Sequence, residues 1–503
     1  MLLPVEEAEP RRYILQAWTY FRLPTGCSTA SLRLQLQRHS ITMFVAVSAL
    51  IFISACGNLA GPEYQRPAAV EKVTWSDSGA VDVSAPDTIR LDWWSNFNDP
   101  YLNELMQQAL AKNADLRVLA ARVGVAEAVI GQANAARLPT IDSALGANYL
   151  KSEGRDSNRS VSQATALGWE ADIWGKLKKG VQAQKAGLKA TEADWRAGYL
   201  SLAANVSQTY FQIRTFDEQI DQQQSALAST GNILSIYEAQ HKEGLIPKIQ
   251  VLQQQAELGR LRNDLLELKR LRRLAENALS TLLGIPAGDK DVPKQHLIDT
   301  VDAVTVPAGL PADLLSRRPD IIAAEYRVLE AHELLGQARL AKLPTISLTA
   351  NAGNTSAALS DLVKTFTFGL TPTFSLPIFD PNVHARIHVS EAQTNVSEEE
   401  YRRTVIRAFE EVENALVNLS SRRAQQDELI GQRDKLRIVN TQIQAQLAEG
   451  MVTQLQVFES ERSLLAAELR LLDNHQQFLS DTVTLYSALG GGWPKEIVGG
   501  KAQ

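Results

Sequence analysis

Cysteine is almost absent from this chain: among 503 residues it occurs only at Cys27 and Cys56. Cys27 precedes a predicted cleavage site and Cys56 is a predicted lipid attachment point, so the mature chain has no cysteine left for a disulfide. Strong charge is missing as well, because a net charge of −6 is spread over the whole length. A charge this small and negative gives no indication of binding to nucleic acid.

Long apolar runs are also scarce. The 15 residues Ile41–Ala55, which follow Arg33 and Arg38, are too short for a permanent membrane span and are typical of a secretory signal. The run ends in Ile53-Ser54-Ala55-Cys56-Gly57, which resembles a bacterial lipobox, and Gly57 in place of aspartate favours delivery to the outer membrane. The alternative is a buried helix with an incidental cysteine. No later segment reaches about 18 apolar residues, so any further crossing of a membrane must use strands.

Signatures of catalysis and of cofactor binding are missing too. The seven histidines form no HExxH motif, and no phosphate-type glycine loop occurs. His384 and His388 could share one helix face, but they lack a carboxylate at ligand spacing. Acidic pairs such as Glu410-Glu411 are typical of a solvated helix. The sequence therefore predicts no enzyme, no cofactor and no metal site.

Proline is absent from two very long stretches, about Lys176–His241 and Asn382–Leu447. At about 1.5 Å per residue each predicts a helix on the order of 100 Å long, which exceeds an ordinary globular domain. The first stretch carries a seam of small residues that predicts close helix packing. The members of this seam are Ala183, Ala186, Ala190, Ala193, Ala197, Leu200, Ala204, Ser207 and Phe211. The second has Val405, Phe409, Val412, Leu416 and Leu419 in a similar register.

The chain is an internal duplication. Residues 114–141 return 205 positions later as 319–346, and twelve of the 28 aligned positions are identical. The register continues after one inserted residue, which places Gly244 on Gly450 and Gly284 on Gly490. Each half therefore predicts a helix, two strands, a very long helix, a turn and a return helix.

Four predicted strands of 9–14 residues are long enough to cross a bilayer, since a tilted membrane strand needs about 9–11 residues. They are Ile141–Tyr149, Ser162–Trp174, Ile346–Thr355 and Phe366–Phe379. Two hairpins with open edges would leave backbone groups unpaired in lipid, so several chains must pool their strands.

Matching turns end the two long helices. Glu243-Gly244 and Glu449-Gly450 place glycine where a helix ends in a left-handed residue. The return helices, about 248–283 and 454–488, carry leucine-rich seams. We expect Leu258, Leu261, Leu265 and Leu268 to be buried in the first, and Leu455, Phe458, Leu465, Leu469, Leu472 and Leu479 in the second. Each return helix is about half as long as the long helix that precedes it. The return helix and the repeat helix of about 24 residues could therefore stack end to end beside that long helix.

The domain organisation follows from these boundaries. We expect a leader at 1–55, a lipidated tether at 56–98, a first repeat at 99–300, a second repeat at 301–493 and a short tail at 494–503. In the tether, Trp93, Trp94 and Phe97 precede Asp99-Pro100, a good helix N-cap followed by a good first residue. The aromatic cluster is expected to pack this helix onto the body.

Four motifs together resemble the TolC-like outer-membrane efflux lipoproteins of the NodT/OprM type. They are the lipobox at Cys56, residues 61–67 (GPEYQRP), the segment with Trp93-Trp94, Phe97, Asp99-Pro100 and Leu102, and residues 309–321 (GLPADLLSRRPDI). The resemblance covers Cys56 to Trp493. It implies a homotrimer in the outer membrane, in which twelve strands form one β-barrel and the helices form a periplasmic α-barrel. It also implies a passive conduit for small molecules that docks on a periplasmic adaptor and an inner-membrane pump of the RND type.

Two other functions remain open at this point. A periplasmic coiled-coil scaffold would tolerate loss of the strands, and a lipoprotein hydrolase would require a catalytic constellation. The exported compounds are not specified. Relatives often carry an acid after the second tip glycine, where this chain has Met451-Val452-Thr453. Glu243, Gly244, Glu449 and Gly450 are therefore the predicted residues of a periplasmic aperture.

Overall fold

The computed structural model describes residues 61, 63–68, 72, 74–76, 90–151, 153–154, 158–295, 297, 314–357, 359–494 and 497. All the elements lie in one compact unit, Glu63–Gln503. Its helices are η3 (Trp93–Phe97), α2 (Pro100–Lys112), α3 (Ala114–Ala135), α4 (Lys176–Lys242), α5 (Lys248–Leu282), α6 (Leu314–Arg317), α7 (Pro319–Leu340), η5 (Leu359–Lys364), α8 (Pro381–Ala448) and α9 (Gln454–Ala488). Its strands are β1 (Thr140–Leu150), β2 (Asn158–Ala171), β3 (Thr345–Ser356) and β4 (Phe366–Ser375).

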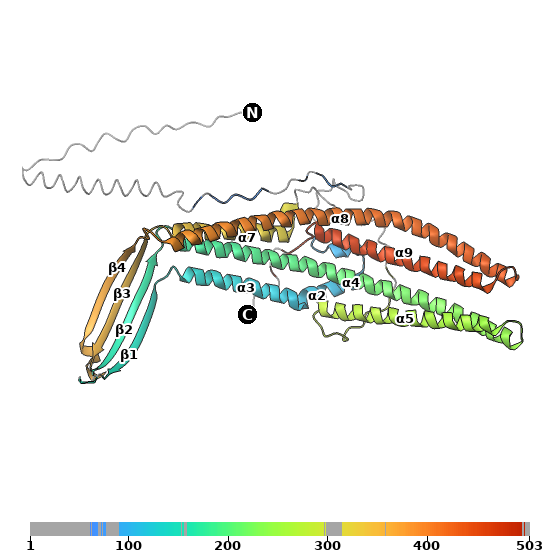
Figure 1. Cartoon of the computed structure of the whole chain (residues 1–503), viewed down its shortest axis with the longest axis horizontal. Coiled ribbons are helices and arrows are strands. Elements are labelled where there is room, and N and C mark those ends of the chain that lie inside the picture. Colours follow the sequence, from blue (N-terminus) through green and yellow to red (C-terminus); the bar gives the residue numbers. More distant parts are fainter. Residues whose placement is uncertain are drawn as a thin grey trace, which may run out of the picture. The chain divides into compact units, whose positions relative to one another are not determined.

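Two long helices organise this unit. α4 has 67 residues and α8 has 68, which confirms the lengths predicted from the proline-free stretches. α3 and α5 both pack along α4, and α7 and α9 both pack along α8 (Figure 1). α4 also packs on α7 and α9, so it joins the two repeats. The predicted end-to-end stacking beside each long helix is therefore confirmed.

The small-residue seam of α4 is buried, as predicted. Ala183 and Ala193 are fully inaccessible, and of the nine predicted members only Ala197 is half-buried. Alanine lets the backbones of α4 and its neighbours approach closely, because its side chain ends at the Cβ atom. The predicted α8 seam is also buried throughout.

The predicted seam of α9 is partly wrong. Leu455 is 61% exposed, and the buried positions near the start of the helix are Val457 and Ser460 instead. Further along α9, Asn474 is buried and donates to the Arg422 carbonyl at 3.1 Å. On α9, small and polar side chains face α8, because their hydrogen bonds are satisfied across the interface between the two helices. Several of the leucines predicted for this seam lie beside that interface. In α5, Leu258 and Leu261 are buried as predicted, and the next two leucines are half-buried.

The four strands form one antiparallel sheet in the order β1-β2-β3-β4. β2 pairs with β3 through Trp169 opposite Leu348 and Leu167 opposite Ala350, so the hairpins of the two repeats join directly. Within the described residues, β1 and β4 are edge strands that each pair on one side only. The strand positions agree with the prediction to within a few residues at each end.

The predicted aromatic cluster before α2 is buried. Trp93 stacks on Tyr486 of α9 at 5.0 Å between ring centroids, and Phe97 meets Phe211 of α4 edge-on at 5.0 Å. Asp99 caps α2 by accepting from the backbone N–H groups of Tyr101 and Leu102, as the N-cap prediction requires. This segment therefore fastens the start of the first repeat to helices of both repeats.

The stacked helices are joined by two equivalent junctions. In the first repeat, the Asn113 side chain donates to the carbonyl of Leu282, near the end of α5, at 3.0 Å. In the second, Arg318 donates to the carbonyl of Ala488, the last residue of α9, at 2.9 Å. Gly284 lies where a Cβ atom would be 2.3 Å from the Lys112 carbonyl oxygen, so only glycine fits at this approach. The segment around Arg318 thus has a structural role, since Arg318 also binds Asp320 and Glu411.

A buried ionic network distinguishes the first repeat from the second. Asp217 lies between Arg214, at 3.4 Å, and Arg272, at 2.6 Å, and Arg272 also binds Glu276 at 2.7 Å. The arginines donate in addition to the backbone carbonyls of Pro293 and Val292. The network therefore holds the connector that follows α5. With the offset of 206, the equivalent positions of the second repeat are Ser420, Arg423, Phe478 and Thr482.

Candidate functional site

The sheet has two chemically different faces. Side chains alternate across a strand, and paired residues share a face, so the pairing register assigns each residue to one side. One face carries most of the large apolar side chains, including Leu145, Leu167, Leu348 and Leu370. In β3 and β4 the other face carries small and polar residues: Thr345, Ser347, Thr349, Asn351, Gly353, Thr355, Thr367, Gly369, Thr371, Thr373 and Ser375.

The apolar face is open in the isolated chain. Phe368 is 67% exposed and Leu370 is 58% exposed, although both belong to the apolar side of the sheet. Exposed apolar patches of this kind mark contacts with a membrane or a partner. Strands that are apolar toward lipid and polar on the opposite side are the pattern of membrane-spanning sheets. Among the described helices, by contrast, none is both long and apolar enough to cross a bilayer.

The two tip turns lie at the opposite ends of the long helices from the strands (Figure 1). Gly244 has φ 73° and Gly450 has φ 72°, so both adopt the predicted left-handed conformation. The following N–H groups, of Leu245 and Met451, donate to the carbonyls of Gln240 and Gln446. These bonds satisfy the last carbonyls of α4 and α8 and make two equivalent, sharply ended tips.

The predicted aperture carboxylates are exposed at these tips. Glu243 and Glu449 each precede a tip glycine and form the C-caps of α4 and α8. Negative charge at the C-terminal end of a helix is mildly unfavourable, by a few tenths of a kcal/mol. Thr453 has a defined local role, because it forms a capping box with Gln456 at the start of α9. Backbone hydrogen bonds therefore end α4 and α8, and a capping box begins α9, without any contribution from the Glu243 and Glu449 carboxylates.

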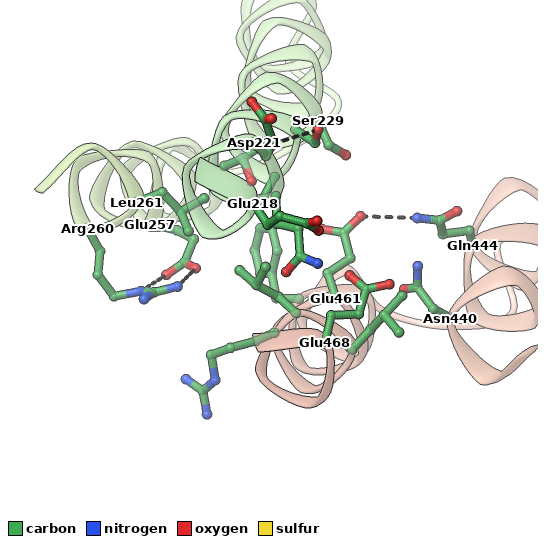
Figure 2. Close-up of a pocket in the computed structure, with 18 residues that line it drawn as sticks. Glu218, Asp221, Ser229, Glu257, Arg260, Leu261, Asn440, Gln444, Glu461 and Glu468 are labelled. Carbon is green, nitrogen blue, oxygen red and sulfur yellow. Dashed lines mark hydrogen bonds and ion pairs between the residues drawn. The ribbon is translucent and has the colours of Figure 1, made fainter. Parts of the chain in front are cut away.

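A cavity of about 510 Å³ lies between the α4–α5 hairpin and α8–α9, on the tip side of the connector network (Figure 2). Apolar side chains such as Leu261 and Phe458 form part of its wall, and carboxylates converge on it from three helices. The carboxylates are Glu218, Asp221, Glu257, Glu461 and Glu468. Several are already held by cations outside or at the rim of the cavity, for example Glu257 by Arg260 and Glu468 by Arg437.

Glu461, which lines this cavity, has an uncharged amide as its described partner. Gln444 of α8 donates to its carboxylate at 3.1 Å, as Figure 2 shows. Burial, and then the charge of Glu257, raise the pKa of Glu461. Burial and the nearby Glu461 raise the pKa of Tyr237 to about 12. Because the pKa of Glu461 is higher in the folded chain than in the unfolded chain, protonation of Glu461 stabilises the fold. This stabilisation is complete below the ordinary glutamate pKa and is lost as the pH rises through the raised value.

The remaining predicted residues fall into two groups. Cys56 and the leader 1–55 lie outside the described residues, so the lipid attachment remains a prediction. His384 and His388 lie near the start of α8, and His388 contacts Glu391 at 3.3 Å. Among the described residues, no group of three or more His, Cys, Asp or Glu side chains is arranged to hold a metal ion.

Sequence reasoning missed the buried network and the carboxylate cavity. Arg214 could have been noticed, because it continues the 3-4 spacing of the α4 seam beyond Ser207 and Phe211. A charged residue at a seam position must find a buried partner, which points to a network. The carboxylates around Glu461 carry no comparable signal, since acidic residues are common on solvated helix faces.

Comparison with known proteins agrees with this geometry. A sequence model of the outer membrane efflux protein family matches residues 105–285 and 310–491. The solvent efflux pump outer membrane protein SrpC of Pseudomonas putida is 30% identical over 482 residues, which cover 90% of this chain and 98% of SrpC. The probable outer membrane lipoprotein SilC of Salmonella typhimurium is 29% identical over 461 residues, which cover 89% and 98%. The structure of the outer-membrane channel OprN matches with a TM-score of 0.78 at 27% identity, over 86% of this chain and 99% of OprN.

These matches confirm the predicted resemblance, the mainly helical fold with four strands, and the function as an outer-membrane efflux channel. They also confirm the predicted location in the outer membrane, with a large helical portion in the periplasm. The family and these relatives are transport proteins rather than enzymes. The chain belongs to the outer membrane efflux protein family.

Proposed function

We propose that three copies of this chain pool their strands into one closed twelve-stranded barrel, and that their long helices continue it as a periplasmic tube. The observation that carries this proposal is the four-stranded sheet with one apolar face, one polar face and two edge strands. In lipid, each unpaired backbone group at an edge costs several kcal/mol. Pairing β1 of one copy with β4 of the next satisfies both edges.

The two faces then match the two environments of a conduit. The face with Phe368 and Leu370 lies toward lipid, and the face with Thr367 and Thr371 lines a hydrated passage. A barrel of four strands would have no room for its own side chains, whereas twelve strands leave an interior space. A coiled-coil scaffold, the alternative considered from the sequence, would leave this sheet without a role.

We infer that the conduit is passive and works with a periplasmic adaptor and an inner-membrane pump of the RND type, exporting small molecules such as drugs or other toxic compounds. Support comes from SrpC, which is named as a component of a solvent efflux pump. A passive conduit needs no specific contact with its cargo, so the choice of cargo and the driving force would lie in the partners.

We further propose that the mature chain begins at Cys56 and is anchored there by lipid. The lipobox supports this, and so does the relative SilC, which is named as a lipoprotein. Residues 1–55 would then be removed, 56–98 would be the tether, 99–300 and 301–493 the two repeats, and 494–503 the tail. The two family matches, 105–285 and 310–491, support this division of the body.

Mass spectrometry of the detergent-extracted complex tests these proposals together. Under native conditions we expect three times the mass of one chain. After denaturation, we expect a subunit that begins at a lipid-modified Cys56. A monomer would reject the conduit, whereas a trimer with an unmodified Cys56 or an uncleaved leader would reject only the anchor.

We also propose that the tip turns form the periplasmic aperture. Both tips end helices that begin at the strands, about 100 Å away for a helix of 67 residues. Three copies would bring six tips together at the end farthest from the membrane, which is where the tube can narrow. Glu243 and Glu449 are exposed there and would form a polar ring.

Neutralising the tip carboxylates is expected to lower the cation selectivity of the open channel and to raise its resting conductance. Glu243→Gln, Glu449→Gln and the double variant would be compared with the wild type in planar bilayers. Glu267→Gln, at an exposed position on α5 away from the tips, is the matched control. If all three tip variants match the wild type in both quantities, closure depends on helix packing alone.

A further inference from the structure

A band of exposed apolar residues lies where the strands meet the helices. Ile378 is 91% exposed and Phe379 is 87% exposed, and both lie between β4 and α8. Ile173, at the equivalent position between β2 and α4, is 58% exposed. The Trp169 and Trp174 indoles donate to the carbonyls of Arg137 and Pro344, so they tie this band to the ends of the preceding segments. Aromatic and apolar residues at such a level are typical of a membrane interface.

The four connections that contain or adjoin this band carry an excess of positive charge. We call residues 134–139, 172–179, 339–344 and 376–388 the collar. It contains seven Lys and Arg residues and two Asp residues, although the whole chain has a net charge of −6. The cations are Arg137, Lys176, Lys178, Lys179, Arg339, Lys342 and Arg386.

The two acids of the collar are occupied by capping. Asp172 accepts from the backbone N–H groups of Leu177 and Lys178 at the start of α4. Asp380 caps α8 by accepting from the Asn382 N–H. Both acids therefore accept hydrogen bonds at helix ends, and Asp172 also forms an ion pair with Arg137 at 4.0 Å.

Three of the seven cations remain free for an external ligand. Arg137, Lys176, Lys179 and Arg339 form ion pairs with Asp172, Glu170, Glu333 and Glu391. Lys178, Lys342 and Arg386 are exposed, and no ion pair with another described residue involves them. They come from three different connections. Lys178 follows Ile173-Trp174 in the first repeat, and Arg386 follows the equivalent pair Ile378-Phe379 in the second.

We propose that Lys178, Lys342 and Arg386 bind the phosphate headgroups of anionic phospholipids in the membrane leaflet that faces the periplasm. This inference rests on the proposed function, because it requires the strands to cross the membrane with the helices on the periplasmic side. The apolar band contacts the acyl chains, and the free cations lie one step farther out, at the level of the headgroups. Basic residues beside a membrane surface attract anionic lipids in this way.

The role of the collar would be to set the depth of the channel in the membrane. A lipid anchor at the N-terminus restrains only the tether, whereas the collar acts on the connections between sheet and helices themselves. Because both repeats contribute, three copies would present a continuous ring of cations. Anionic lipid would therefore be retained around the ring in preference to zwitterionic lipid.

Native mass spectrometry can count the lipids retained by the purified full-length complex. The complex would be exposed to equal amounts of phosphatidylglycerol and phosphatidylethanolamine, in the wild type and in a Lys178→Gln/Lys342→Gln/Arg386→Gln variant. The control variant is Lys242→Gln/Lys248→Gln/Lys435→Gln, which removes three exposed cations near the tips. Soluble glycerol phosphate is added as a competitor without acyl chains.

We expect the wild type and the control to retain more phosphatidylglycerol than phosphatidylethanolamine, and the collar variant to lose about five-fold or more of that preference. Glycerol phosphate should compete weakly, because it lacks the acyl chains that the apolar band contacts. Equal preference in all three proteins, or an equal loss in the control, would overturn the proposal. Oligomer mass and conductance are measured on the same preparations. A trimeric, conducting collar variant that keeps its preference rejects the collar alone, whereas a monomeric wild type rejects the conduit.

Discussion

Replacing Asp217 with alanine is expected to destabilise the folded chain by about 3–5 kcal/mol, as when one partner of a buried ion pair is removed. Asp217 is 1% exposed and is the only carboxylate among the described residues that pairs with the equally buried Arg214. Its loss leaves the guanidinium of Arg214 with carbonyl and amide acceptors and the rings of Tyr101 and Tyr210, but with no countercharge. The connector after α5 would loosen with it.

Chemical unfolding followed by the helical circular dichroism signal measures this change. Asp434→Ala removes an exposed carboxylate that pairs with its neighbour Arg433, and it should cost less than about 1 kcal/mol. The double variant Asp217→Ala/Arg214→Met removes both charges and should recover at least half of the loss, since an apolar replacement of a buried pair is often tolerated. If Asp217→Ala costs no more than Asp434→Ala, the network does not stabilise the fold.

Placing an arginine on the apolar face of the sheet is expected to prevent stable insertion. Leu370 lies near the middle of β4 on the face that we assign to lipid. A basic residue at the bilayer midplane costs about 2–4 kcal/mol in a membrane strand, and a trimer would carry the substitution three times. Leu370→Arg should therefore deplete the protein from the outer-membrane fraction and reduce the yield of the assembled complex.

The neighbouring residue provides the matched control. Thr371 lies on the polar face, so Thr371→Arg introduces the same side chain into the hydrated passage. We expect this variant to insert and assemble normally, with an altered conductance. The measurement is the amount of protein in the outer-membrane fraction and the mass of the extracted complex. Equal behaviour of the two variants, whether both insert or both fail, would contradict the assignment of the faces.

The cavity and the buried network show where sequence reasoning ends. Arg214 and Asp217 are three residues apart on one helix, but Arg272 reaches them from α5, and the backbone of Pro293 from the connector. Likewise, Arg318 belongs to the motif at residues 309–321, yet its bond to Ala488 joins residues that are 170 positions apart. A motif marks such a residue without naming its partner.

The sequence by itself determined the duplication, the four strands, the two long helices and the turns at Gly244 and Gly450. These features depend on local spacing: alternation gives strands, an absence of proline permits long helices, and glycine allows the left-handed end of a helix. Only the tertiary structure decided which side of α9 is buried, that β2 pairs with β3 across the two repeats, and which charges are left free at the collar. Those outcomes depend on packing and charge pairing between segments that are distant in the chain, and no local period encodes such pairings.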